Sequence, residues 1–199
     1  MKKQAILALF LSVTLFAPAQ ENCTVIETNK PKEIFSLLNE FIKEGSDRDV
    51  YVDRFISHNL NSVVVLDSLA MKSIDEFSDS EGQGALLGRA NYNKVPTGIS
   101  KFYSYRTQII LHEKIFQNDY LVRDVFFHEL GHMLGLPHNS DSEAKAHPFR
   151  MMNKSTPVNI ILASPPNKES WKKTLDVFWD KVSRSNKASW MRARRNDNG

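Results

Sequence analysis

One stretch of the sequence indicates both the fold and the chemistry of this chain, Phe127-His128-Glu129-Leu130-Gly131-His132-Met133-Leu134-Gly135-Leu136-Pro137-His138. Because His128 and His132 are four residues apart, a helix places both imidazoles on one face, where they can reach the same zinc ion. Glu129 is next to the first histidine, so its carboxylate can accept a proton from a water molecule held on the metal. The stretch therefore predicts a zinc-binding helix that also carries a general base.

A third ligand has to come from a chain that turns back, because a continuing helix would carry His138 away from the metal. Gly135 allows the necessary left-handed turn, and His138 follows three residues later. Three histidines leave the fourth zinc position to water, which is typical of a catalytic site rather than a structural one. A glutamate on a later helix, Glu169, is the rival third ligand, but the position of His138 argues against it.

These residues resemble the signature of the metzincin clan of zinc endopeptidases, HExxHxxGxxH followed by a turn that contains methionine. The resemblance implies a general base and acid at Glu129, a turn at Gly135, and zinc ligands at His128, His132 and His138.

The same resemblance predicts the methionine turn within Arg150-Met151-Met152-Asn153. Met152 is favoured over Met151, because a small or polar residue commonly follows the methionine in the clan. The motif is similar to those of matrix metalloproteinases and pappalysin-like bacterial enzymes. Asn139 and Lys154, together with the long spacing from His138 to Met152, leave the subfamily open.

The resemblance also implies a fold of the α/β (α+β) class. It predicts a twisted mixed sheet, an active-site helix, and a smaller C-terminal subdomain with one helix. In this clan an edge strand binds the substrate by antiparallel pairing. The corresponding segment here contains Gly88, Arg89, Ala90 and Asn91. A specificity pocket is expected beside the chain at 153–158.

Local patterns predict the individual elements. Apolar residues at helical spacing predict helices over 31–44, 119–134 and 169–183. Short β-branched or apolar runs predict strands over 62–66, 85–92 and 107–115, and the acidic, glycine-containing stretch over 75–84 predicts a loop. His112 and Glu113 are interpreted as neighbouring strand residues, since no second histidine completes another zinc motif there.

Composition excludes several classes of protein. The 199 residues are 41% hydrophobic and 25% charged, as in an ordinary globular domain. The chain has 26 Lys+Arg and 23 Asp+Glu, and without Lys2 and Lys3 the balance is 24 to 23. A nearly neutral chain lacks the charge that nucleic-acid binding requires. Its single cysteine excludes an internal disulfide framework.

The first residues are typical of a secretory signal peptide. Lys2 and Lys3 precede an apolar run from Ala5 to Phe16, and Ala17-Pro18-Ala19 predicts cleavage after residue 19. The apolar run is shorter than the roughly 20 residues of a transmembrane helix. We therefore expect a secreted, periplasmic or cell-surface protein without a transmembrane anchor. Its single catalytic domain would cover 20–199, with subdomains over 20–138 and 139–199.

Two features keep alternatives open. Cys23 has four interpretations: a lipid attachment site, an intermolecular bridge, a thiolate that blocks the zinc, or a free thiol. Asp141 and Glu143 are candidates for binding Ca²⁺, although they lack the full set of oxygen ligands such a site needs.

The sequence thus predicts a secreted zinc-dependent endopeptidase that acts on a protein or peptide through a water activated by Glu129. The alternative is a catalytically silent zinc-binding recognition protein on the same fold. Glu129 argues against it, because a silent protein has no chemical need for that carboxylate. The substrate and the oligomeric state stay open.

Overall fold

A computed structural model of the protein describes residues 26–76, 87–96, 103–147, 151–154, 158–163 and 165–185. In chain order, the elements are β1 (Glu27–Thr28), α1 (Pro31–Ser46), α2 (Asp53–Asn59), β2 (Leu60–Leu66), α3 (Ser68–Glu76), β3 (Gly88–Pro96), β4 (Tyr103–His112), a 3₁₀ helix η1 (Glu113–Gln117), α4 (Asp119–Met133), α5 (Asp141–Ala146), α6 (Val158–Ala163) and α7 (Lys168–Arg184). The expected signal peptide and Cys23 lie outside the described residues.

The four strands form one mixed sheet in the order β1-β2-β4-β3, as expected for this fold class. Strands β2 and β4 run parallel, and β3 runs antiparallel to β4. Val63 of β2 pairs with Ile109 of β4, and Val65 pairs with Leu111. These alternate residues are buried, because successive side chains of a strand point to opposite faces and this face meets the helices.

Among the described strands, β3 is an edge of this sheet, and the register decides which of its main-chain groups point away from β4. Leu87 pairs with His112, since the His112 N–H donates to the Leu87 carbonyl. Opposed residues in antiparallel strands alternate between bonded and non-bonded pairs. The main-chain groups of Gly88 and Ala90 therefore point away from β4.

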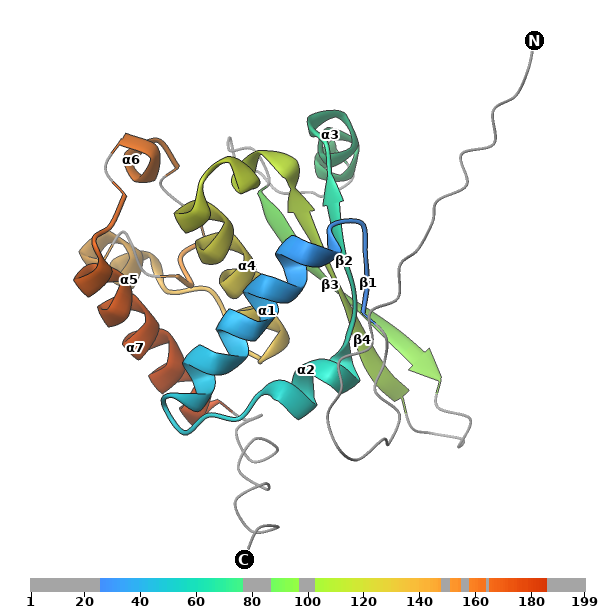
Figure 1. Ribbon diagram of the computed structural model, residues 1–199, viewed down its shortest axis with the longest axis horizontal. Coiled ribbons are helices and arrows are strands. Elements are labelled where there is room, and N and C mark those ends of the chain that lie inside the picture. Colours follow the sequence, from blue (N-terminus) through green and yellow to red (C-terminus); the bar gives the residue numbers. More distant parts are fainter. Residues whose placement is uncertain are drawn as a thin grey trace, which may run out of the picture.

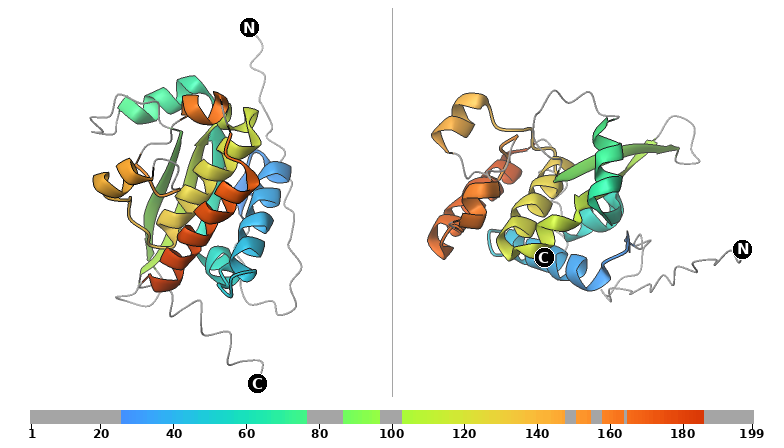
Figure 2. Two further views of the ribbon diagram at one scale, coloured as in Figure 1. Left: turned by 90° about the vertical axis from the view of Figure 1, so that its left-hand side faces the viewer. Right: turned by 90° about the horizontal axis from the view of Figure 1, so that it is seen from above.

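Helices α1 and α4 lie side by side on the same side of the sheet, and α7 covers α4 from outside (Figures 1 and 2). An aromatic cluster joins the three helices. The Phe41 ring of α1 lies 4.8 Å from the ring of Phe127, 5.9 Å from Phe178 and 4.7 Å from Trp179. Trp171 packs on Tyr120, so the aromatic side chains of α7 serve packing.

The long helices agree with their predicted ranges, whereas two other predictions are wrong. The strand expected over 107–115 ends at His112, because the His112 Nδ1 accepts the Lys114 N–H and begins a 3₁₀ helix, so Glu113 is not a strand residue. The C-terminal part was expected to hold one helix, but α5 and α6 precede α7. Ser140 begins α5 by accepting the Glu143 N–H.

The predicted loop over 75–84 and the strand over 85–92 also differ in their limits. Asp67 accepts the N–H groups of Leu69 and Ala70 and starts α3, which includes residues 75 and 76. The structure describes nothing from 77 to 86, and β3 runs from Gly88 to Pro96. Among the described residues, no helix combines the length and the apolar character needed to cross a membrane.

Candidate metal centre

The first two histidines lie on α4, a helix with a capped N-terminus and a largely buried surface. Asn118 caps its N-terminus, where the side-chain oxygen accepts the N–H groups of Tyr120 and Leu121, each at 2.9 Å. The helix lies between the sheet and α7 and is buried on most of its surface. His128 and His132 are one turn apart, and their ring centroids lie 4.6 Å from each other.

The chain turns back at the end of α4, as the sequence predicted. Gly135 has a φ of 91°, a left-handed conformation that favours glycine. Its N–H donates to the His132 carbonyl and the Leu136 N–H donates to the Gly131 carbonyl, which together form a Schellman motif. This turn returns His138 to the face that carries the other two histidines.

The three histidines converge on one point. The His138 Nε2 atom lies 3.2 Å from the His128 Nε2 and 3.1 Å from the His132 Nε2. Two nitrogens bound at 2.0 to 2.1 Å to a tetrahedral zinc would lie about 3.3 Å apart. In the part of the chain that the structure describes, this is the one group of three or more His, Cys, Asp or Glu side chains placed to hold a metal ion.

Hydrogen bonds behind the cluster orient two of the rings. The His128 Nδ1 faces the Met151 carbonyl, and the His132 Nδ1 lies 2.9 Å from the Leu136 carbonyl. A carbonyl only accepts, so each Nδ1 must carry the proton and each Nε2 presents a lone pair.

Burial, reinforced by His132, lowers the pKa of His128 to about 4. Burial also lowers the pKa of His138, with smaller contributions from His132 and Lys154. The neutral imidazoles suit a cation.

The Glu129 side chain reaches from α4 to the edge strand. Its side chain is buried, and its Oε1 would be 2.9 Å from a Cβ atom built on Gly88. Burial raises the pKa of Glu129 to about 8, and a hydrogen bond from the Ala90 main chain opposes this. A cation held by the neighbouring histidines would favour the carboxylate and lower that pKa. The carboxyl group is thus positioned at β3, on the residue that follows the first histidine of the cluster.

The two methionines of the predicted turn have different roles. Both side chains are buried. Met151 offers its main-chain carbonyl to His128. The Met152 Sδ would lie 2.6 Å from a Cβ atom on Gly131, so it packs directly against α4 between the two helical histidines.

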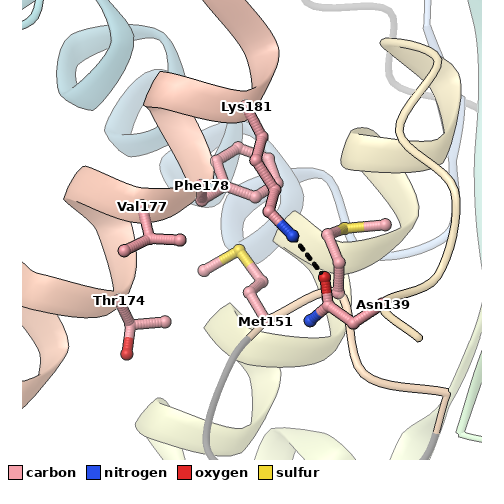
Figure 3. Close-up of a pocket in the computed structure, with 7 residues that line it drawn as sticks. Asn139, Met151, Thr174, Val177, Phe178 and Lys181 are labelled. Carbon is pink, nitrogen blue, oxygen red and sulfur yellow. Dashed lines mark hydrogen bonds between the residues drawn. The ribbon is translucent and has the colours of Figure 1, made fainter. Parts of the chain in front are cut away.

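A polar network behind the site was not predicted from the sequence. Asn139 follows His138 and bonds both Asn153 and Lys181. Figure 3 shows Lys181 reaching from α7 to Asn139 beside Met151. In the sequence Asn139 stands out only as the neighbour of His138, and no local pattern connects it to Lys181.

The remaining candidate residues are separated from the cluster or face away from it. Arg89 is exposed and Asn91 is half-buried, on alternate positions from Gly88 and Ala90. Glu169 is an exposed residue in the first turn of α7 that pairs with Lys173. Of the two calcium candidates, Asp141 is exposed in α5. Glu143 accepts a hydrogen bond from the Lys181 Nζ at 2.6 Å.

Comparisons with known proteins agree with this geometry. The family model described as Matrixin matches residues 62–161, just over half of the 199-residue chain. The match includes most of β2, the edge strand, α4 and all three histidines. No curated protein and no solved structure matches the chain. Matrixins are zinc metallopeptidases, and this chain belongs to the matrixin family.

Proposed function

We propose that this protein is a secreted zinc-dependent endopeptidase. The observation that carries the proposal is the convergence of three Nε2 atoms on the motif whose buried Glu129 reaches the edge strand β3. The proposed ligands are His128, His132 and His138, with Met152 as the methionine beneath them. The donor set is neutral and nitrogen-only, which suits Zn²⁺ better than Ca²⁺ or Mg²⁺.

The proposed chemistry is hydrolysis of a peptide bond with Glu129 as general base and acid. Zinc, when bound, would polarise the scissile carbonyl and make a water molecule more acidic. Glu129 would accept the proton of the attacking water and deliver it to the leaving amine. Its contact with Gly88 and the bond from Ala90 would hold the carboxylate at the place where water and substrate meet.

The proposed substrate is an extended protein or peptide chain that pairs with β3. The outward main-chain groups of Gly88 and the outward carbonyl of Ala90 offer hydrogen bonds that do not depend on substrate side chains. Arg89 and Asn91 lie on the same strand and complete the proposed binding segment. The chain at 153–158, of which residues 155–157 lie outside the described residues, is proposed to line the specificity pocket.

The proposed compartment rests on the first 19 residues. Lys2 and Lys3, the apolar run and Ala17-Pro18-Ala19 support removal of this segment during export. Sequencing the N-terminus of the exported protein tests this part of the proposal, with residue 20 expected first. An N-terminus at Met1 would contradict it.

The catalytic proposal is tested with Glu129→Gln, which replaces the carboxylate by an amide of equal size. We expect the variant to bind zinc as the wild type does and to lose at least a hundredfold in kcat/KM on a peptide library, because no base takes the proton from water. Glu169→Gln is the matched control on an exposed glutamate, and it should keep both zinc and activity.

A catalytically silent binding protein on the same fold remains the second candidate. Wild-type protein that holds zinc and binds peptides but cleaves none of them would favour this candidate. Loss of zinc in Glu169→Gln would instead show that the third ligand is wrongly assigned.

A further inference from the structure

A chain of hydrogen bonds runs from α7, through the residue that follows the third histidine, to the His147 carbonyl. The Lys181 Nζ of α7 donates to the Asn139 Oδ1 at 2.7 Å (Figure 3). The Asn139 Nδ2 donates to the Asn153 Oδ1 at 2.7 Å, and the Asn153 Nδ2 donates to the His147 carbonyl at 3.0 Å. Both asparagines are buried.

The direction of this chain is fixed at both ends. A lysine ammonium group only donates, and a main-chain carbonyl only accepts. Each asparagine between them must therefore present its oxygen toward Lys181 and its NH₂ toward His147. Without Lys181, the Oδ1 of the buried Asn139 would lose the donor that the structure shows for it.

The two asparagines are adjacent to the residues that build the site. Asn139 follows His138, and its N–H donates to the Met152 carbonyl at 2.7 Å. Asn153 follows Met152, and the residue before that, Met151, holds the His128 ring through its carbonyl. The network thus joins the segment that carries the third histidine to the turn that orients the first.

We propose that Lys181 is a positioning residue for the metal centre, acting through Asn139 and Asn153. This inference rests on the proposed function, since it assumes that the three histidines bind zinc. Lys181 also pairs with Glu143 of α5, so its ammonium group is held from two sides. Its side chain is one-third exposed, so replacement should leave the fold intact.

Lys181→Met removes the ammonium group and retains an unbranched apolar side chain. We expect zinc affinity, measured by competition with a chromogenic chelator, to fall about threefold to tenfold. This is less than the tenfold to hundredfold typical of direct partners of metal ligands. Lys181→Arg keeps donors at this position and should restore affinity to within about threefold of the wild type.

Two further variants separate positioning from general stability. Lys173→Met removes an exposed lysine of the same helix that pairs only locally with Glu169, and it should leave zinc affinity unchanged. Asn139→Ala should weaken zinc binding as Lys181→Met does. If Lys181 acts through Asn139, adding Lys181→Met to Asn139→Ala should cause no further loss. Visible absorption of the Co²⁺-loaded protein reports ligand geometry. It should therefore change in Lys181→Met and in Asn139→Ala.

The outcomes distinguish this inference from the proposed function. A wild-type chain that binds no zinc overturns both. A wild type that binds zinc, with Lys181→Met binding it equally tightly, overturns the role of Lys181 alone. Additive losses in the double variant would also overturn it, as would an equal loss of affinity in Lys173→Met.

Discussion

At the scale of single residues, the absence of a side chain at Gly88 leaves room for the carboxyl group of Glu129. A Cβ atom at this position would lie 2.8 Å from the Val125 Cγ1 and 2.9 Å from the Glu129 Oε1. Both distances are too short, so in Gly88→Ala the carboxyl group has to move. Misplacement of a reacting group by about 1 Å can cost a hundredfold in rate.

We therefore expect Gly88→Ala to lower kcat/KM by about tenfold or more with zinc content unchanged. Peptide hydrolysis and metal analysis of the same preparation test this, and urea unfolding confirms that the variant is folded. Full activity would show that Glu129 has another position during catalysis.

Gly135 contributes through its backbone conformation. With a φ of 91°, an alanine there would be strained by roughly 1 to 2 kcal/mol. We expect Gly135→Ala to lower the free energy of unfolding by that amount and to weaken zinc binding, because the turn carries both His138 and the carbonyl that orients His132. Gly135→Asn should lose less, since asparagine tolerates left-handed backbone better. Equal losses in both variants would contradict this explanation.

At the scale of elements, the start of η1 depends on one neutral histidine. The His112 Nδ1 accepts the Lys114 N–H at 3.0 Å, which a protonated ring cannot do. Burial and the charge of Lys114 lower the pKa of His112 from 6.5, against smaller opposing effects of Glu113 and Asp67. Below pH 6.5 the unfolded chain therefore takes up a proton that the folded chain does not, and stability falls as the pH decreases.

An asparagine at position 112 can accept the Lys114 N–H at the start of η1 as the histidine does, and its side chain does not titrate. We expect the free energy of unfolding to fall less between pH 7.5 and pH 5.5 in His112→Asn than in the wild type. Urea unfolding in the presence of a chelator measures both proteins without the contribution of a bound metal. Only the pH dependence matters, since the smaller side chain lowers stability equally at all pH values. Parallel pH profiles would refute the role of His112.

Long elements could be predicted from the sequence, because each buries a stripe or a run of apolar residues. Helices α1 and α7 have Ile34, Phe41, Leu175 and Phe178 at helical spacing, and all four are buried. The short helices α2, α3, α5 and α6 have too few residues for such a period. Two of them do have a local signal at the N-terminus: Asp67 caps α3, and Ser140 and Glu143 of α5 have the spacing of a capping box.

The same distinction applies to the candidate site. His128, Glu129, His132, Gly135 and His138 lie within one short motif, so their grouping follows from helix and turn geometry. The partners of Asn139 are 14 and 42 positions away along the chain. Their contact depends on how α7 packs over the methionine turn, which no local pattern contains.

At the scale of the whole molecule, zinc should stabilise the fold. A metal that binds only the folded state adds about 2.7 kcal/mol to the free energy of unfolding at a concentration of 100 times its Kd. We expect a chelator to lower the Tm of the wild type and to leave His132→Ala unaffected, because two histidines alone hold zinc weakly. Thermal unfolding with zinc and with chelator tests this. An equal response of both proteins would place the metal elsewhere.

The edge strand β3 also limits the length of peptide that can pair with it. Along β3, outward-facing main-chain groups recur at every second residue from Gly88 to Lys94, and Pro96 beyond them has no N–H. At about 3.4 Å per residue this edge spans about 20 Å, which corresponds to a paired peptide of roughly seven residues. The Ala90 N–H within it is already bonded to Glu129. A peptide that pairs with this edge is therefore selected by how many residues it can extend alongside the strand, and residues beyond that span add no hydrogen bonds to β3.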